Sequence, residues 1–209
     1  VAISGDTAIV GARKTSGGGI SNLGHSYIFT RTGDDDNGYN WSQQAKLEVA
    51  GNEGDYFGSS VAISGDTVIV GATGQDYDKY GNTYLKNAGA AYIFTRTGDD
   101  VNGYTWSQGQ KIVAGDRGSN VFFGKSVAIS DDTAIVSAQG ENYRTGAAYI
   151  FTRNGDTWSQ TARLAADDGS TYDYFGYSVA ISGDTAIIGA FMEDHDVYGN
   201  NEKLSLIHI

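Results

Sequence analysis

Val1-Ala-Ile-Ser-Gly-Asp-Thr-Ala-Ile-Val-Gly-Ala12 opens the chain, and closely similar segments stand at residues 61–72, 127–138 and 179–190. In each copy a Gly-Asp or Asp-Asp pair separates two short apolar runs, which is typical of a β-hairpin with a two-residue turn. In the first copy this turn pairs Ile3 with Ala8. It also pairs Val1 with Val10. Because both faces of the hairpin carry small or apolar side chains, we expect it to be buried on two sides.

Three other segments recur between these hairpins and always in the same order. Tyr-Ile-Phe-Thr-Arg begins at residues 27, 92 and 149, Trp-Ser-Gln begins at 41, 106 and 158, and Phe-Gly stands at 57, 123 and 175. The strands become more polar from the first to the fourth of each unit, as in a propeller blade whose inner strands are covered by neighbours and whose outer strand faces water. The sequence therefore predicts an all-β fold, a partial β-propeller of about three and a half four-stranded antiparallel blades.

The blade boundaries follow from the recurring segments. We expect blades at 1–56, which lacks a Phe-Gly lead, at 57–122 and at 123–174, with a half blade at 175–203. We interpret 204–209 as a non-native tail. An open arc leaves a bare blade face at each end, so we expect a longer parent chain whose missing blades cover these faces. The isolated chain is expected to be unstable, to aggregate or to self-associate.

Composition limits the function classes. The chain has 209 residues, 30 glycines, no cysteine, and 25 acidic against 14 basic residues, for a net charge of −11. This charge repels phosphate backbones, so we expect no nucleic-acid partner. No apolar run reaches the roughly 18 residues of a transmembrane helix, and the absence of cysteine excludes disulfides and thiolate metal sites.

The recurring Phe57-Gly58-Ser-Ser-Val61-Ala-Ile segment, ending in Val70-Gly71-Ala72, resembles the FG-GAP repeat of integrin alpha subunits and of many bacterial surface proteins. The resemblance implies a β-propeller used for adhesion or ligand binding, on an extracellular or cell-surface protein. Integrin-like repeats carry a calcium loop between their first two strands. Here that connection is only two residues long, too short for the six or more oxygens that calcium prefers, so the calcium site of the family does not transfer.

Binding is expected on the loops between the second and third strands, which share one face with the links between blades. These loops vary in length and carry the candidate ligand-binding residues Tyr77, Tyr80, Tyr84, Tyr143 and Tyr198. Tyrosine adds contact area at small entropic cost, and loops on a rigid scaffold usually carry function. The alternative is that these are tolerated insertions without a ligand.

Two of these loops share a pattern of alternating carboxylates before a glycine and an asparagine. The candidate calcium ligands are Asp76 with Asp78, and Asp194 with Asp196. The alternative, which we favour, is a pair of acidic turns whose side chains bond their own backbone. Asp34-Asp35-Asp36-Asn37-Gly38 is also interpreted as a turn, because its counterpart has Val101 in place of Asp36.

No convergent set of catalytic residues recurs, and His25 and His195 are each interpreted as loop histidines. The leading hypothesis is a non-catalytic module that binds a protein or a glycan at the cell surface. The alternatives are a propeller domain of a secreted carbohydrate-active enzyme and a purely structural repeat.

Overall fold

The chain forms four antiparallel sheets, which we call blades 1 to 4, and each is a simple meander. The computed structural model describes residues 1–77, 83–99, 103–192 and 205–208. Blade 1 contains β1 (Ala2–Ser4), β2 (Thr7–Ala12), β3 (His25–Asp34) and β4 (Gly38–Leu47). Blade 2 contains β5 (Phe57–Ser64), β6 (Thr67–Ala72), β7 (Ala90–Asp99) and β8 (Gly103–Ile112).

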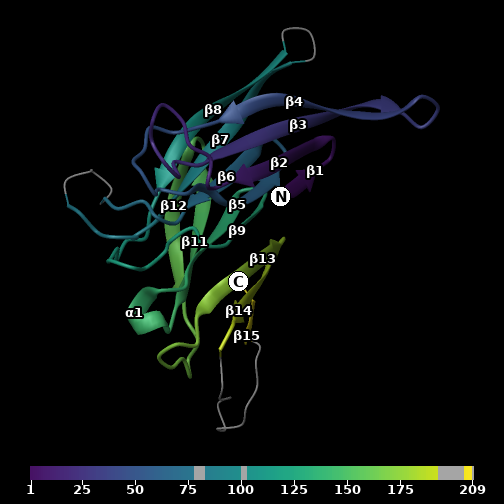
Figure 1. Ribbon diagram of the computed structural model, residues 1–209. Coiled ribbons are helices and arrows are strands. Elements are labelled where there is room, and N and C mark those ends of the chain that lie inside the picture. Colours follow the sequence, from purple (N-terminus) through teal and green to yellow (C-terminus); the bar gives the residue numbers. More distant parts are fainter. Residues whose placement is uncertain (78–82, 100–102, 193–204, 209) are drawn as a thin grey trace.

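Blades 3 and 4 continue the arc (Figure 1). Blade 3 contains β9 (Val127–Ser130), β10 (Thr133–Ala138), β11 (Ala147–Asn154) and β12 (Thr157–Leu164), with the short α1 (Glu141–Arg144) between β10 and β11. Blade 4 contains β13 (Phe175–Ser182), β14 (Thr185–Ala190) and β15 (Ser205–His208). The expected all-β partial propeller is confirmed, and α1 is the one departure from an all-strand pattern among the described residues.

The segment 204–209, expected to be a non-native tail, supplies the third strand of blade 4. The backbone of β15 pairs with β14 in the register Ala186 to Ile207 and Ile188 to Ser205. Blade 4 therefore has three strands in place of the expected half blade of two. Whether this segment is native stays a prediction.

The first hairpin of each blade has the predicted register. Ile3 lies opposite Ala8 in blade 1, and Val61 lies opposite Val70 in blade 2. The hairpin is also buried on two sides where a blade has two neighbours, since every residue of β6 is buried. Alternating side chains of β6 therefore enter two different cores.

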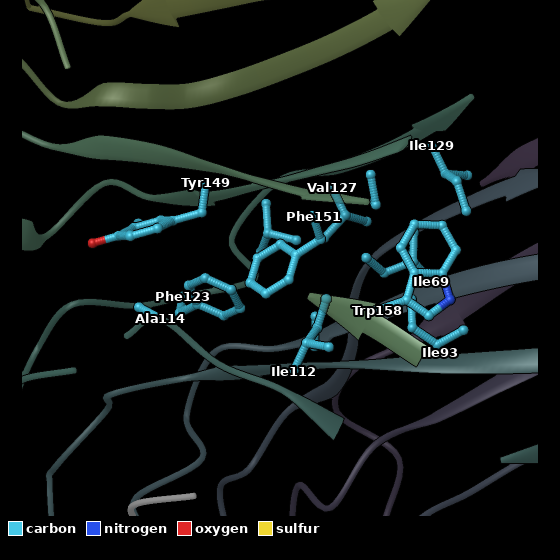
Figure 2. Close-up of a cluster of buried hydrophobic side chains, with 14 of the residues drawn as sticks. Ile69, Ile93, Ile112, Ala114, Phe123, Val127, Ile129, Tyr149, Phe151 and Trp158 are labelled. Carbon is cyan, nitrogen blue, oxygen red and sulfur yellow. The ribbon is translucent and has the colours of Figure 1, made fainter. Parts of the chain in front are cut away.

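The hydrophobic core lies between blades. Phe57, Val68 and Val70 of blade 2 pack with Ile9 and Ile28 of blade 1. On the other face of blade 2, Ile69 and Ile93 pack with Phe123, Tyr149, Phe151 and Trp158 of blade 3, as Figure 2 shows. A third cluster joins Ile135 and Ile150 of blade 3 to Phe175 and Ile188 of blade 4.

Polar contacts at the two-residue turns repeat from blade to blade. The hydroxyl oxygens of Ser4, Ser64 and Ser130 accept the backbone N–H of the next blade's turn, at 3.2, 3.1 and 3.3 Å. Within blades, the turn carboxylates pair with the arginine that follows Tyr-Ile-Phe-Thr; the pairs are Asp6 with Arg31, Asp66 with Arg96 and Asp132 with Arg153. We call the end of the blades that carries these turns the turn face.

Candidate functional site

The opposite end of the blades is called the loop face. Its described residues are the loop segments 13–24, 73–77, 83–89 and 139–146 and the links 48–56, 113–122 and 165–174. The loop containing α1 lies on the left of Figure 1, away from the β3–β4 hairpin tip on the right. Each loop is tied to the next link by backbone bonds. The N–H groups of Phe57, Phe123 and Phe175 donate to the carbonyls of Leu23, Ala88 and Thr145, at 2.9, 3.0 and 2.8 Å.

A glycine before the third strand of each blade makes this close approach feasible. Gly89 has a φ of +79°, and a Cβ atom there would lie 2.2 Å from the carbonyl oxygen of Phe123. Gly24 and Gly146 occupy the same place against Phe57 and Phe175. Only glycine fits a position with both positive φ and a backbone neighbour at that distance. The loops therefore end at fixed points, although their own sequences differ.

A hollow of about 690 Å³ opens on the loop face at blade 3. It lies between the link 113–122, the loop containing α1 and the link 165–174. Its lining combines carboxylates, asparagines, an arginine and exposed tyrosines: Asp116, Gly118, Ser119, Asn120, Val121, Phe122, Gly140, Glu141, Asn142, Tyr143, Arg144 and Tyr172. A concave site with several converging polar groups and an aromatic rim is the kind of place where ligands bind.

The α1 turn projects Tyr143 into solvent at the rim of the hollow. Asn142, Tyr143 and Arg144 have φ values of +46°, +56° and +71°, in the left-handed region that non-glycine residues seldom adopt. Tyr143 is 83% exposed. Strained backbone that displays a bare aromatic ring is the type of feature found at binding sites.

Arg144 joins the α1 turn to the opposite rim. Its guanidinium lies 5.6 Å from the ring centre of Tyr172 and 5.7 Å from that of Tyr174. It also donates a hydrogen bond of 3.1 Å to the hydroxyl of Tyr174. These contacts hold the partly exposed Tyr172 in place, because a cation over an aromatic face is attracted by the ring quadrupole.

Asp116 and Glu141 line one wall of the hollow and share two partners behind it. The Tyr149 hydroxyl lies 2.5 Å from Asp116 Oδ1 and also contacts Glu141 Oε2. Arg163 Nε donates to Glu141 Oε1 at 2.8 Å and lies 3.5 Å from Asp116 Oδ2. The hydroxyl of Tyr149 points away from the core cluster, at its edge in Figure 2.

Burial raises the pKa of Tyr149, and its hydrogen bonds to Asp116 and Glu141 raise it further. The phenol therefore stays protonated and serves as a donor to the carboxylates. With Arg163 beside them, both carboxylates are already engaged. This wall can accept hydrogen bonds from a ligand through its remaining lone pairs.

The described tyrosines that were predicted to bind ligand do not form one site. Tyr143 lies at the hollow. Tyr77 and Tyr84 face each other in another loop, with ring centres 5.7 Å apart in a T-shaped arrangement. Tyr80 and Tyr198 lie outside the described residues.

Of the four predicted calcium ligands, only Asp76 lies within the described residues; Asp78, Asp194 and Asp196 lie outside them. The Asp76 Oδ1 atom accepts the backbone N–H of Asn87 at 2.7 Å. Asn87 stands 11 positions further along the chain, so this bond joins the two ends of the loop and is not the local turn of the acidic-turn alternative. In the described part of the chain, no group of three or more His, Asp or Glu side chains is placed to hold a metal ion. Calcium binding stays a prediction.

The other singled-out residues have structural partners. Asp34 Oδ1 accepts the N–H groups of Asp36 and Asn37 at 3.1 and 2.8 Å, which confirms the turn interpretation. These hydrogen bonds lower the pKa of Asp34, and the bond from the Asn37 N–H has the largest effect.

The interpretation of His25 as a loop histidine is wrong, because His25 is the first residue of β3 and its backbone lies opposite Ala12. Its side chain is buried beside Thr15, whose hydroxyl lies 2.5 Å from its Nδ1, and burial lowers its pKa. His195 lies outside the described residues.

Tyr172, Arg144, Asp116 and Glu141 were missed by sequence reasoning. The links between blades lie on the same face as the loops between the second and third strands, as the sequence predicted. The candidate residues, however, came only from those loops. Tyr172 lies in the link 165–174, two residues before Tyr174, which directly precedes the Phe-Gly pair. An aromatic residue in a link of the same face is the signal that could have found it.

The fold and this face define a propeller-type repeat module. The family model for the FG-GAP repeat matches residues 41–94, 106–151 and 158–203. These segments cover well over half of the sequence, and the chain belongs to the FG-GAP repeat family. Each match begins at the tryptophan of one outer strand, and the first two end in the third strand of the next blade.

Repeats of this family occur in extracellular or cell-surface proteins. Comparison with curated proteins finds no match. Within the described ranges no helix is long and apolar enough to span a membrane.

Proposed function

We propose that this chain is a non-catalytic binding module of an extracellular or cell-surface protein, and that its ligand is a protein or a glycan held on the loop face. The observation that carries the proposal is the hollow at blade 3, where Tyr143 and Tyr172 flank a wall of carboxylates. Tyrosine rings supply apolar contact area, and the carboxylates and asparagines supply hydrogen-bond partners.

The rim of the hollow is preorganised for binding. Tyr172 is fixed by Arg144, and the α1 turn is fixed by the backbone bond from Tyr174 to the Arg144 carbonyl at 2.8 Å. Preorganisation of this kind lowers the entropic cost of binding. The site therefore suits a ligand that meets a rigid surface.

For the carbohydrate-active enzyme alternative, the carboxylates at the hollow to consider are Asp116 and Glu141. Glycoside hydrolysis requires one carboxyl group as an acid and another as a base or nucleophile. Here both carboxylates are engaged by Tyr149 and Arg163. This arrangement favours binding over hydrolysis, and product formation from a polysaccharide distinguishes the two.

The test is binding of the fluorescently labelled chain to a glycan array and to intact cells, with and without prior protease or glycosidase treatment of the cells. We expect binding that falls at least tenfold in the double variant Tyr143→Ala with Tyr172→Ala. The matched control is Tyr39→Ala, which removes a 47% exposed tyrosine from the turn face. Absence of binding to arrays and cells, or equal loss in the control, would contradict the proposal and favour a structural repeat.

A further inference from the structure

A second hollow, of about 250 Å³, lies between the outer strands of blades 2 and 3, away from the loop face. Thr95 and Gly109 of blade 2 line one side of it, and Asp156 and Trp158 of blade 3 line the other. Both blades lie inside the arc, with a core on each of their two faces. Ligand pockets commonly enclose about 300–1,000 Å³, so this hollow suits one side chain better than a whole small molecule.

The equivalent place between blades 1 and 2 is filled by a glutamine of the chain itself. Gln44 extends from the outer strand of blade 1, and its Oε1 atom accepts the indole N–H of Trp106 in blade 2 at 3.1 Å. The same oxygen accepts the hydroxyl of Thr30 in blade 1 at 3.3 Å. One carboxamide oxygen therefore satisfies a donor from each of two neighbouring blades.

Between blades 2 and 3 this glutamine is replaced by Gly109. In each blade the position follows a glutamine whose backbone lies opposite a phenylalanine of the third strand; the pairs are Gln43 with Phe29 and Gln108 with Phe94. The two blades therefore have the same backbone position beside the next blade, occupied by a long carboxamide side chain in one and by no side chain in the other.

Both donors that the carboxamide of Gln44 satisfies have equivalents at the hollow. Trp158 has the strand position of Trp106, and Thr95 has that of Thr30. No residue within the described ranges accepts a hydrogen bond from the indole N–H of Trp158 or from the hydroxyl of Thr95. Trp158 is only 4% exposed, at the edge of the core cluster in Figure 2. A donor placed this deeply gains from an acceptor that enters the hollow.

Gln110 also lines the hollow, but its amide group is already engaged. Its Oε1 atom accepts the backbone N–H of Trp158, and its Nε2 atom donates to the carbonyl of the same residue, both at 2.8 Å. These two bonds hold the outer strand of blade 3 against blade 2. The backbone that carries the indole ring is therefore fixed, which lowers the entropic cost of binding at the hollow.

The charges around the hollow favour a neutral ligand group. Asp156 lines the hollow, so it would repel a carboxylate. The guanidinium of Arg153 is on the same wall, but it is paired with Asp132. A carboxamide carries both an acceptor and two donors, so it can accept from Trp158 and Thr95 and donate to Asp156.

We propose that this hollow is a docking site for a glutamine side chain of a partner polypeptide, whose carboxamide takes the place that Gln44 fills between blades 1 and 2. Its carbonyl oxygen accepts from Trp158 Nε1 and Thr95 Oγ1, and its amide N–H donates to Asp156. The partner segment lies along the outer strands of blades 2 and 3. This surface is separate from the loop face and acts independently of any ligand bound there.

The test is nuclear magnetic resonance of the ¹⁵N-labelled chain, whose three tryptophans give three indole N–H signals. The probe is N-acetylglutamine amide. We expect it to shift the Trp158 signal saturably and to slow its exchange with water, while the Trp106 signal stays unchanged. The matched control probes are N-acetylleucine amide and N-acetylglutamate amide, which have the same backbone amides. We expect them to bind at least about tenfold more weakly, because they lose hydrogen bonds or meet a like charge.

Gly109→Gln supplies the carboxamide from the chain itself. A Cβ atom at this position meets only the carbonyl oxygen of Ile93, at 3.6 Å, so the fold accommodates a side chain there. We expect the Trp158 signal of this variant to shift without any probe, its exchange to slow to that of Trp106, and the response to the probe to be lost. Gly109→Leu is the control, which blocks the probe but leaves the Trp158 signal of the free chain in place.

Three results would overturn the proposal. Equal exchange rates for the Trp158 and Trp106 indole N–H groups in the free chain would show that the Trp158 donor is already satisfied. Equal shifts with the leucine and glutamine probes would show an apolar crevice only. No response of Trp158 to the glutamine probe would show that the hollow does not accept a carboxamide.

Discussion

The turn face and the loop face differ in how they place the same residue type. On the turn face, the carboxylates of Asp6, Asp66 and Asp132 are 62%, 60% and 64% exposed and pair with arginines. On the loop face, Asp55 and Asp173 are 3% and 2% exposed. Asp55 accepts the backbone N–H of Asn52 at 2.8 Å, and burial raises its pKa.

This difference indicates where the chain tolerates amino-acid substitutions. The turn face repeats one exposed motif in water, so each member contributes little by itself. The base of the loop face is buried and closely packed, so its members are constrained, while the loops that rise from it vary. A rigid base under variable loops is the arrangement in which binding sites arise.

The largest loss of stability is expected from a glycine substitution on the loop face, compared with a matched glycine substitution on the turn face. Gly89→Ala on the loop face combines positive φ with a Cβ 2.2 Å from a backbone oxygen of blade 3. Left-handed strain of about 1–2 kcal/mol and overpacking of about 1–3 kcal/mol predict a loss of about 2–5 kcal/mol in the free energy of unfolding. Chemical denaturation followed by circular dichroism measures it.

Gly65→Ala is the matched control at the turn face. Its φ is +53°, but no atom lies within 4 Å of the added Cβ. Blade 3 already carries a non-glycine residue at this position, Asp131 with a φ of +49°. We expect a loss of about 1–2 kcal/mol from strain alone. Equal losses for the two alanine variants would remove the distinction between the faces.

An intermediate effect is expected at alkaline pH from Tyr92, which lies beneath the loop face. Burial raises the pKa of Tyr92 to about 12. In the unfolded chain tyrosine loses its proton at about pH 10. Between these values the unfolded state loses a proton that the native state keeps, so stability falls as pH rises from about 10 to 12.

The two-unit shift corresponds to at most about 2.7 kcal/mol. Tyr92→Phe removes this titration, so we expect its melting temperature to fall less steeply than that of the wild type between pH 9 and 11. Tyr39→Phe, on the exposed hairpin of the turn face, is the control and should follow the wild type. Parallel curves for the wild type and Tyr92→Phe would show that this phenol does not titrate differently in the two states.

The smallest effects are expected from removing single carboxylate charges. Asp66→Asn at pH 7 should cost about 0–1 kcal/mol, and the loss should shrink in 1 M salt because the pair with Arg96 is exposed. Asp55→Asn should be neutral or stabilising at pH 7, since it removes a charge that burial disfavours.

The stabilising effect of Asp55→Asn depends on pH. A raised pKa means that the native carboxyl binds its proton more tightly than the unfolded one. The penalty is full above the native pKa and is relieved as pH falls through it, so the advantage of Asp55→Asn should disappear in acid. Thermal melts at pH 7 and pH 4 measure this, and an advantage that grows in acid would contradict the assignment.

The scaffold was predictable because it repeats. Four copies of one hairpin predict the register, the two-sided burial of β6 and the meander order, and the structure confirms all three. Gly-Asp turns, alternating apolar residues and recurring Phe-Gly pairs are local signals, and repetition removed their ambiguity. The third strand of blade 4 was not predicted because 204–209 was interpreted as a non-native tail, outside the fold.

The site was less predictable because it depends on residues that do not repeat. Tyr143 was found as an exposed loop tyrosine, but its partners at the hollow come from two links and one loop. The pairing of Asp116 with Tyr149, 33 positions apart, requires the packing of blade 3 on its preceding link. No spacing rule in a single sequence encodes such a contact.

The offset between family repeat and blade has a consequence for how such chains can change length. Each matched segment starts on an outer strand and the first two finish in the third strand of the following blade. A tandem duplication of one such genetic unit therefore inserts the trailing part of one blade and the leading part of another. The inserted piece brings both sides of a junction at once, so an array can grow or shrink by whole units while every internal junction remains matched.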